Sequence, residues 1–230
     1  MISVNSFQSM GAVDGPGVRF VVFMQGCNFK CKYCHNPETI EIKKENLFSG
    51  EDILKKVERY KSFIFEKGGV TFSGGEPLLQ AKELIEVFKL LKSNGYHIAL
   101  DTNGSILNDD VKELLNYTDL VLLDIKMPND EKYREFIGAP IGNTLSFFEY
   151  LKEINKDVWI RQVVIKGVNT NKENIEFLKE MIKSPNVKKT ELLPFKKICI
   201  TKYEEMGIPF LMADYEETDI NTINNLYKAL

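Results

Sequence analysis

The sequence is poor in several residue types, and each shortage narrows the class of protein. It has four cysteines, two histidines and one tryptophan in 230 residues, and a formal net charge of only −3. So small a charge offers no broad basic field for nucleic acid. No apolar run approaches the roughly 18 residues of a membrane-spanning helix, and Met1–Gly11 has no signal-peptide pattern. We therefore expect a cytoplasmic protein that binds neither nucleic acid nor membrane.

The remaining composition is that of an ordinary globular protein. Hydrophobic residues make up 43% of the chain and charged residues 27%. We find no repeat, low-complexity tract or long flexible linker, and 230 residues suffice for one sizeable core. The expectation is a single domain that spans residues 1–230.

Strand-like apolar runs alternate with longer helical patterns along the chain. The runs typical of strands are Val18–Gln25, Val70–Phe72, Tyr96–Leu100, Leu120–Asp124, Val158–Ile165 and Val187–Leu193. The helical patterns cover about Gly50–Phe65, Gln80–Ser93, Asp109–Asn116, Glu131–Phe136, Thr144–Ile154, Asn171–Ile182 and Asp219–Leu230. This alternation is typical of parallel strands with helices packed outside them. Six strand–helix units predict an α/β fold, a partial (β/α)6 barrel of the TIM type.

Three of the four cysteines follow the first predicted strand within eight positions: Cys27, Cys31 and Cys34. Soft thiolate ligands select zinc, copper(I) or iron–sulfur clusters. A structural zinc site closes with four protein ligands, and an electron-transfer cluster usually has four cysteines. A [4Fe-4S] cluster held by three cysteines leaves one iron free to bind something else. The alternatives are a zinc knuckle completed by His35, or three unrelated buried cysteines.

Polar motifs lie where three further strands are predicted to end, at Ser73–Glu76, Asp101–Gly104 and Asp124–Lys126. Parallel α/β folds place their active sites at this edge. The glycines of the first motif let backbone approach a ligand closely, and Glu76 can accept hydrogen bonds from an ammonium group. Asp124 ends an apolar run, so its carboxylate needs a partner, which can be Lys126 or a cation. A tight turn and a salt bridge at the rim are the purely structural alternatives.

The spacing of the cysteines, with Tyr33 just before the last, resembles the signature of the radical S-adenosylmethionine (SAM) superfamily. Further segments make the chain similar to the glycyl-radical-enzyme activating family, in particular to activating enzymes of pyruvate formate-lyase. The matching segments are Val13–Phe20, Gln25–Cys27, Tyr33–Asn36, Ser73–Glu76, Leu100–Gly104, Leu123–Lys126, Val158–Arg161 and Glu191–Phe195. They occur in the expected order from about residue 6 to residue 195.

The resemblance implies roles for individual residues. The cysteines at 27, 31 and 34 would hold the [4Fe-4S] cluster. The implied SAM site comprises Tyr33, Cys34, His35, Gly74, Gly75, Glu76, Asp124, Ile125, Lys126, Arg161, Val163 and, where the family usually has a histidine, Lys196. A monovalent cation, sodium or potassium, would be bound by Asp101, Thr102, Asp124 and the carbonyl of Leu122. Asp14, in the segment Asp-Gly-Pro-Gly, would face the glycine loop of the partner.

Lys196 is the one departure from the family pattern that affects chemistry. A lysine near neutral pH is charged unless buried, so it can pair with a carboxylate but cannot share a proton as an imidazole does. This departure bears on the identity of the partner more than on SAM binding. Nearby Cys199 is expected to be a small buried residue.

The implied activity is that of an activase. The reduced cluster would cleave SAM, and the resulting 5′-deoxyadenosyl radical would abstract hydrogen from a backbone glycine of a glycyl radical enzyme of the pyruvate formate-lyase type. A flavodoxin or ferredoxin would donate the electron, and we expect a monomer with one cluster. Two other functions stay open: a radical SAM enzyme that acts on a small molecule, and a zinc or electron-transfer module without catalysis.

Overall fold

The computed structural model describes all 230 residues, and these form two compact units. Unit 1 comprises Met1–Asn28 and Thr39–Leu122, and unit 2 comprises Phe29–Glu38 and Leu123–Leu230. Strand β6, Leu120–Asp124, crosses from one unit into the other. The expectation of a single domain stays a prediction.

Unit 1 is built on strands in the order β3-β1-β2-β4-β5-β6. Their bounds are β1 Ile2–Gly11, β2 Arg19–Met24, β3 Leu47–Phe48, β4 Gly69–Gly74 and β5 Ile98–Thr102. Strand β1 pairs antiparallel with both β2 and β3, whereas β2, β4 and β5 are parallel to one another. The ends of these parallel strands therefore deliver residues 25–28, 75–76 and 103–105 to the same edge of the sheet.

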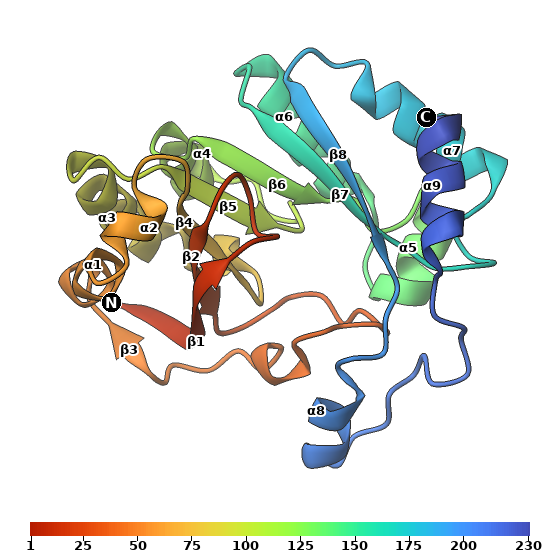
Figure 1. The fold of residues 1–230 in the computed structure, drawn as a ribbon, viewed down its shortest axis with the longest axis horizontal. Helices are drawn as coiled ribbons and strands as arrows, with labels where there is room; N and C mark the ends of the chain where they lie inside the picture. The colour runs from red at the N-terminus through yellow and green to blue at the C-terminus, as the bar shows by residue number, and fades with distance from the viewer. The chain divides into compact units, whose positions relative to one another are not determined.

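The helices of unit 1 are α1 Gly50–Glu58, α2 Lys61–Ile64, α3 Ala81–Ser93 and α4 Asp109–Asn116, with a 3-10 helix η2 at Pro77–Gln80. Helices α1, α3 and α4 lie beside one another (Figure 1). Helix α3 packs on the sheet through Phe88, whose ring centroid is 4.7 Å from that of Phe72 in β4. This contact buries both rings completely.

One predicted helix of unit 1 is wrong in extent. The pattern at Gly50–Phe65 forms two helices, because α1 ends at Glu58 and α2 begins at Lys61. Between them Tyr60 has φ −112° and ψ 9°, outside the helical region. Its ring packs against Phe20 of β2, with centroids 5.6 Å apart. This tertiary contact interrupts the helical pattern.

Unit 2 carries the end of β6 followed by β7, Val158–Val164, and β8, Val187–Pro194, in that order. Strands β7 and β8 are parallel. The helices are α5 Asp130–Ile137, α6 Gly142–Glu153, α7 Lys172–Ile182, α8 Ile200–Glu205 and α9 Ile220–Ala229. Helix α8 lies on the long connection between β8 and α9 (Figure 1). A 3-10 helix, η1 at Pro37–Thr39, lies where the chain returns to unit 1.

The six predicted strands and the α/β class are confirmed, and the bounds of α4 and β6 are those predicted. The sequence did not predict β1, β3 or α8. No helix combines the length and the apolar character that crossing a membrane requires.

Candidate functional site

The first candidate cluster ligand, Cys27, lies just beyond β2 on a tightly fixed backbone in unit 1. The carbonyl of Gly26 accepts a hydrogen bond from the backbone N–H of Glu76 at 2.7 Å, and the N–H of Gly26 donates to the carbonyl of Thr39 at 2.8 Å. A Cβ on Gly75 would lie 2.1 Å from the Gly26 carbonyl oxygen. Only glycine at position 75 allows these two segments to meet, so the Gly-Gly-Glu motif fixes the backbone beside Cys27.

The other two cysteines lie in the loop Phe29–Glu38 of unit 2. The N–H of Cys34 donates to the carbonyl of Cys31 at 3.1 Å, which closes a turn between them. Lys32 donates its N–H to the carbonyl of Phe136 at 2.8 Å, at the C-terminal end of α5. Burial raises the pKa of the Cys34 thiol. All three cysteines are partly exposed and form no disulfide, whereas Cys199 is buried as predicted.

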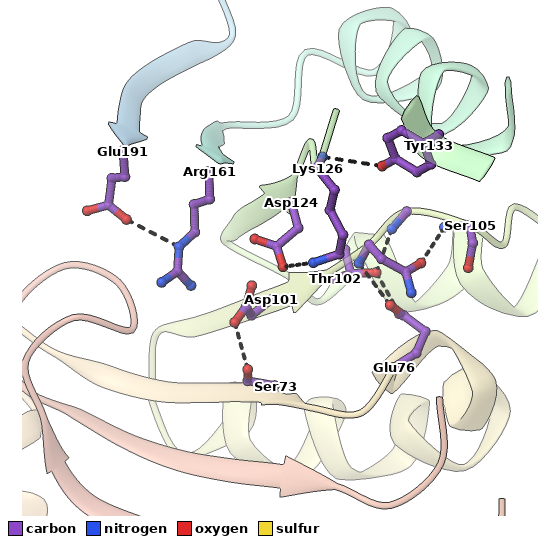
Figure 2. Close-up of polar contacts among 12 residues, drawn as sticks. Ser73, Glu76, Asp101, Thr102, Ser105, Asp124, Lys126, Tyr133, Arg161 and Glu191 are labelled. Carbon is purple, nitrogen blue, oxygen red and sulfur yellow. Dashed lines mark hydrogen bonds and ion pairs between the residues drawn. The ribbon is translucent and has the colours of Figure 1, made fainter. Parts of the chain in front are cut away.

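Glu76 is the most deeply buried carboxylate of unit 1, and protein groups bind both of its oxygens. Its Oε1 accepts from the hydroxyl of Thr102 at 2.6 Å (Figure 2) and from the N–H of Leu78 at 3.0 Å, while Oε2 accepts from the N–H of Asn103 at 2.8 Å. Burial raises the pKa of Glu76 to about 7, since removal from water outweighs these hydrogen bonds. The carboxylate therefore joins η2 to the end of β5.

Asp101 and Thr102 end β5, next in sheet order to β6. The hydroxyl of Ser73 at the end of β4 donates to Oδ2 of Asp101 at 2.6 Å (Figure 2). The Thr102 hydroxyl, which donates to Glu76, also accepts from the N–H of Gly104 at 3.0 Å. The side chain of Thr102 is thus committed to the loop after β5, and Leu122 is fully buried within β6.

Asp124 and Lys126 form the ion pair that the sequence predicted as one of two possibilities. Lys126 Nζ lies 2.7 Å from Oδ2 of Asp124, with the side chains 16% and 31% exposed (Figure 2). Although burial by itself lowers the pKa of Lys126, the charge of Asp124, with those of Cys31 and Tyr33, raises it well above its usual value. Lys126 is therefore a fixed cation beside the loop that carries Cys31.

Arg161 on β7 is connected to both neighbouring strands. Its carbonyl accepts from the N–H of Ile125 at 2.8 Å, just after β6, and its Nε lies 3.4 Å from Oε2 of Glu191 on β8 (Figure 2). Both side chains of this pair are mostly buried. On the same strand, the carbonyl of Val163 accepts from Nδ2 of Asn169 at 2.8 Å. A backbone hydrogen bond thus joins Ile125 to Arg161, and their assignment to the SAM site stays a prediction.

The imidazole ring of His35 contacts the backbone of Lys196. Nε2 of His35 is 3.0 Å from the carbonyl oxygen of Lys196, so Nε2 carries the hydrogen because a carbonyl only accepts. The ammonium of Lys196 lies 3.0 Å from Oε2 of Glu217, and both side chains are exposed. Lys196 thus pairs with a carboxylate, as a lysine at this position was expected to be able to do.

Asp14 lies in the connection from β1 to β2. Its carbonyl accepts from the hydroxyl of Thr71 at 2.6 Å, and the same hydroxyl accepts from Nε of Arg19 at 2.9 Å. Arg19 is fully buried, which lowers its pKa to about 10. The backbone of Asp14 is thus fixed on the middle of β4.

The sequence missed two residues that contact the cysteine loop, Lys202 and Tyr203 of α8. No local pattern pointed to them, because α8 has only six residues and the loop precedes it by more than 160 positions. Their partners became visible only in the folded chain.

The chemistry of the individual donors suits an iron–sulfur cluster. Three partly exposed cysteines that form no disulfide and have no fourth cysteine nearby in sequence provide the soft ligands that iron–sulfur clusters use. Tyr33 is 4% exposed, and its buried hydroxyl has no hydrogen-bond partner within the protein. Burial raises its pKa well above the usual value. Buried polar atoms are rarely left unpaired, so this hydroxyl is suited to a ligand or an ordered water.

Comparison with known proteins gives one family match, one similar curated enzyme and two similar solved structures. The model of the radical SAM superfamily matches residues 21–180. Pyruvate formate-lyase-activating enzyme of Clostridium pasteurianum is 42% identical over 229 residues, which cover 99% of this chain and 96% of that protein. A crystal structure of a domain of pyruvate-formate lyase-activating enzyme from Bacteroides vulgatus has a TM-score of 0.59 and 26% identity, and covers 71% of this chain and 92% of that one. Streptococcus suis SuiB bound to S-adenosylmethionine shares the fold, with a TM-score of 0.68 and 16% identity over 88% of this chain and 44% of that one.

Proposed function

Since the chain belongs to the radical SAM superfamily, and within it to the pyruvate formate-lyase-activating enzymes, we propose that it activates a glycyl radical enzyme by removing a hydrogen atom from a backbone glycine. It is an enzyme of the radical SAM type with the partial-barrel fold of that superfamily, which implies a [4Fe-4S] cluster and SAM.

Cys27, Cys31 and Cys34 would hold the cluster. When bound, the cluster supplies the electron that cleaves SAM and so generates the radical that takes the glycine hydrogen. The contribution of the chain is to fix the ligands: Gly75 packs on Gly26 beside Cys27, and the turn from Cys31 to Cys34 is closed by a backbone hydrogen bond. A backbone fixed before binding lowers the entropic cost of forming the site.

The methionine end of SAM would lie against Gly74, Gly75 and Glu76, and its carboxylate near the cationic Lys126. The pairing of Lys126 with Asp124 at 2.7 Å supports this role, because it keeps the ammonium charged although it is mostly buried. Ile125, Arg161 and Val163 would line the nucleoside, with Tyr33, Cys34, His35 and Lys196 on the wall next to the cysteine loop.

A monovalent cation, sodium or potassium, would bind to Asp101, Thr102, Leu122 and Asp124. Asp101 and Thr102 end β5, Asp124 ends β6, and Leu122 lies in the middle of β6, the strand next to β5 in the sheet order. Carboxylate and carbonyl oxygens are the ligands that hard cations prefer, which favours this residue set for a cation.

The partner would be a glycyl radical enzyme of the pyruvate formate-lyase type, with Asp14 facing its glycine loop. The fixed backbone of Asp14 on Thr71 supports a role in recognition, because a rigid loop loses little entropy on binding. A flavodoxin or ferredoxin would supply the electron, and the enzyme would work as a cytoplasmic monomer.

One observation carries the proposal: a chain that matches an activating enzyme at 42% identity over 99% of its length has three cysteines without a disulfide in the segment after β2. The test is anaerobic. Reconstituted protein is given SAM, a reductant and pyruvate formate-lyase, and 5′-deoxyadenosine is measured beside the electron paramagnetic resonance spectrum. A glycyl doublet equal in amount to the 5′-deoxyadenosine supports the proposal. Production of 5′-deoxyadenosine with no doublet would make the partner wrong and favour a small-molecule substrate.

A further inference from the structure

Helix α8 is a six-residue helix with a small apolar core of its own. Tyr203 on α8 is 6% exposed and packs against Phe210, with ring centroids 4.9 Å apart. Phe210 in turn stacks on Phe195 at 6.4 Å, just after β8. Cys199, at the N-terminus of the helix, is 2% exposed. So short a helix is unstable alone, and these contacts hold it in place.

Lys202 on α8 directs its whole ammonium group at the cysteine loop. Nζ lies 3.1 Å from the carbonyl oxygen of His35, 2.9 Å from Oδ1 of Asn36 and 2.6 Å from Oε1 of Glu38. An ammonium has three N–H donors, and here each has an acceptor from a different residue of the loop. Lys202 therefore has no donor left for a ligand or a partner protein, which makes its function one of holding the loop.

Two further hydrogen bonds join the same two segments. The hydroxyl of Tyr203 donates to the carbonyl of Cys34 at 3.0 Å, and Nε2 of His35 donates to the carbonyl of Lys196 at 3.0 Å. One of these bonds acts directly on the backbone of a candidate cluster ligand. The opposite end of the loop is attached to α5 through the N–H groups of Lys30 and Lys32.

We propose that Lys202 and Tyr203 are positioning residues that hold Cys34–Glu38 in the conformation in which Cys34 binds the cluster and His35 lines the SAM site. The inference rests on the proposed function, because it assumes that Cys34 is a cluster ligand. With only three protein ligands, displacement of one leaves the cluster on two. The loop attachment therefore governs how long the cluster is retained.

Two variants remove the attachment to different degrees. Lys202→Met removes all three donors and keeps an unbranched side chain, whereas Tyr203→Phe removes one hydroxyl and keeps the ring on Phe210. The matched control is Lys166→Met, because Lys166 also makes one 2.7 Å ion pair in unit 2, with Glu216, and contacts no residue of the cysteine loop.

The measurement is the anaerobic rate at which the reconstituted full-length protein releases iron to a ferrous chelator. Thermal unfolding and the electron paramagnetic resonance spectrum of the reduced cluster, with and without SAM, are recorded in parallel. Lys202→Met should release iron about tenfold faster or more. Iron leaves when the loop opens, and loss of one charge-assisted hydrogen bond shifts the equilibrium between the closed and the open loop by roughly that factor. Tyr203→Phe should release it severalfold faster, with a changed spectral response to SAM and an unchanged unfolding temperature, and Lys166→Met should match the wild type.

Two results would contradict the positioning role of Lys202 and Tyr203 and leave the proposed function intact. One is a wild-type protein that holds about four irons while both variants release iron at its rate. The other is faster release that only follows faster global unfolding, which would make the residues merely structural. Should Lys202→Met fail to fold, Tyr203→Phe decides, because its packing is intact. A wild-type protein that holds no iron would instead overturn the proposed function, and this inference with it.

Discussion

Glu76 makes the stability of this protein depend on pH in a direction opposite to that of most carboxylates. Its pKa in the folded protein is about 7, against an ordinary value of 4.5. The folded protein therefore keeps the Glu76 proton at pH values where the unfolded chain has lost it. The contribution of Glu76 to the free energy of unfolding is therefore fully present below pH 4.5 and is lost as the pH rises through about 7. The shift corresponds to about 3 kcal/mol in all, of which about 2 kcal/mol falls between pH 5.5 and 8.

The assay compares wild type with Glu76→Gln, as full-length protein in urea at a series of pH values under reducing conditions. The side-chain amide of the variant cannot ionise. If its oxygen keeps the two hydrogen bonds that Oε1 accepts, its NH₂ group takes the place of Oε2 and faces the N–H of Asn103, so two donors meet. We expect the variant to be less stable at pH 5.5 and to recover about 2 kcal/mol relative to wild type by pH 8. Other titrating groups cancel in the difference. A difference that stays constant from pH 5.5 to 8 would refute the reasoning, since Glu76 would then titrate normally.

Two other predictions follow from single contacts. Gly17→Ala should destabilise the protein by more than about 3 kcal/mol in thermal unfolding, because Gly17 has φ +68° and an added Cβ would lie 1.7 Å from the carbonyl oxygen of Lys67. The control is Gly142→Ala at the start of α6, where an added Cβ would meet no atom within 4 Å. It should change the free energy of unfolding by less than about 1 kcal/mol. Equal effects of the two substitutions would contradict this reasoning. Asp124→Asn should weaken SAM binding about tenfold or more in calorimetry, because Lys126 loses its counter-ion and the proposed cation site loses a carboxylate. Unchanged affinity at full cluster content would make that site wrong.

The parts of the fold that the sequence predicted are those with strong local signals. Helix α4 has the predicted bounds, because Asn108 caps it and its apolar residues repeat at helical spacing. Strand β6 is a short apolar run whose end is marked by a charge at Asp124. The pairing of that charge with Lys126 was within reach of the sequence for the same reason, since the two residues are two positions apart.

The parts that were missed depend on contacts between distant segments. Strand β1 has irregularities in its register with β2 between Val4 and Ser6 and between Gln8 and Gly11, which break the alternation expected of a strand. Helix α8 is too short for a periodic pattern, and Lys202 meets Glu38 across 164 positions. The burial of Glu76 was also missed, because Gly-Gly-Glu suggests an open, ligand-facing carboxylate, whereas its oxygens bind Leu78, Thr102 and Asn103.

Isotope transfer shows whether the radical takes its hydrogen from a glycine of the partner protein. Pyruvate formate-lyase is produced with glycine that carries deuterium on its α carbon, and is incubated anaerobically with the reconstituted protein, SAM and reductant. The mass of the 5′-deoxyadenosine is then measured. We expect a gain of one deuterium per 5′-deoxyadenosine, in the same amount as the glycyl radical formed. Unlabelled 5′-deoxyadenosine from a mixture that contains cluster and labelled partner would contradict it.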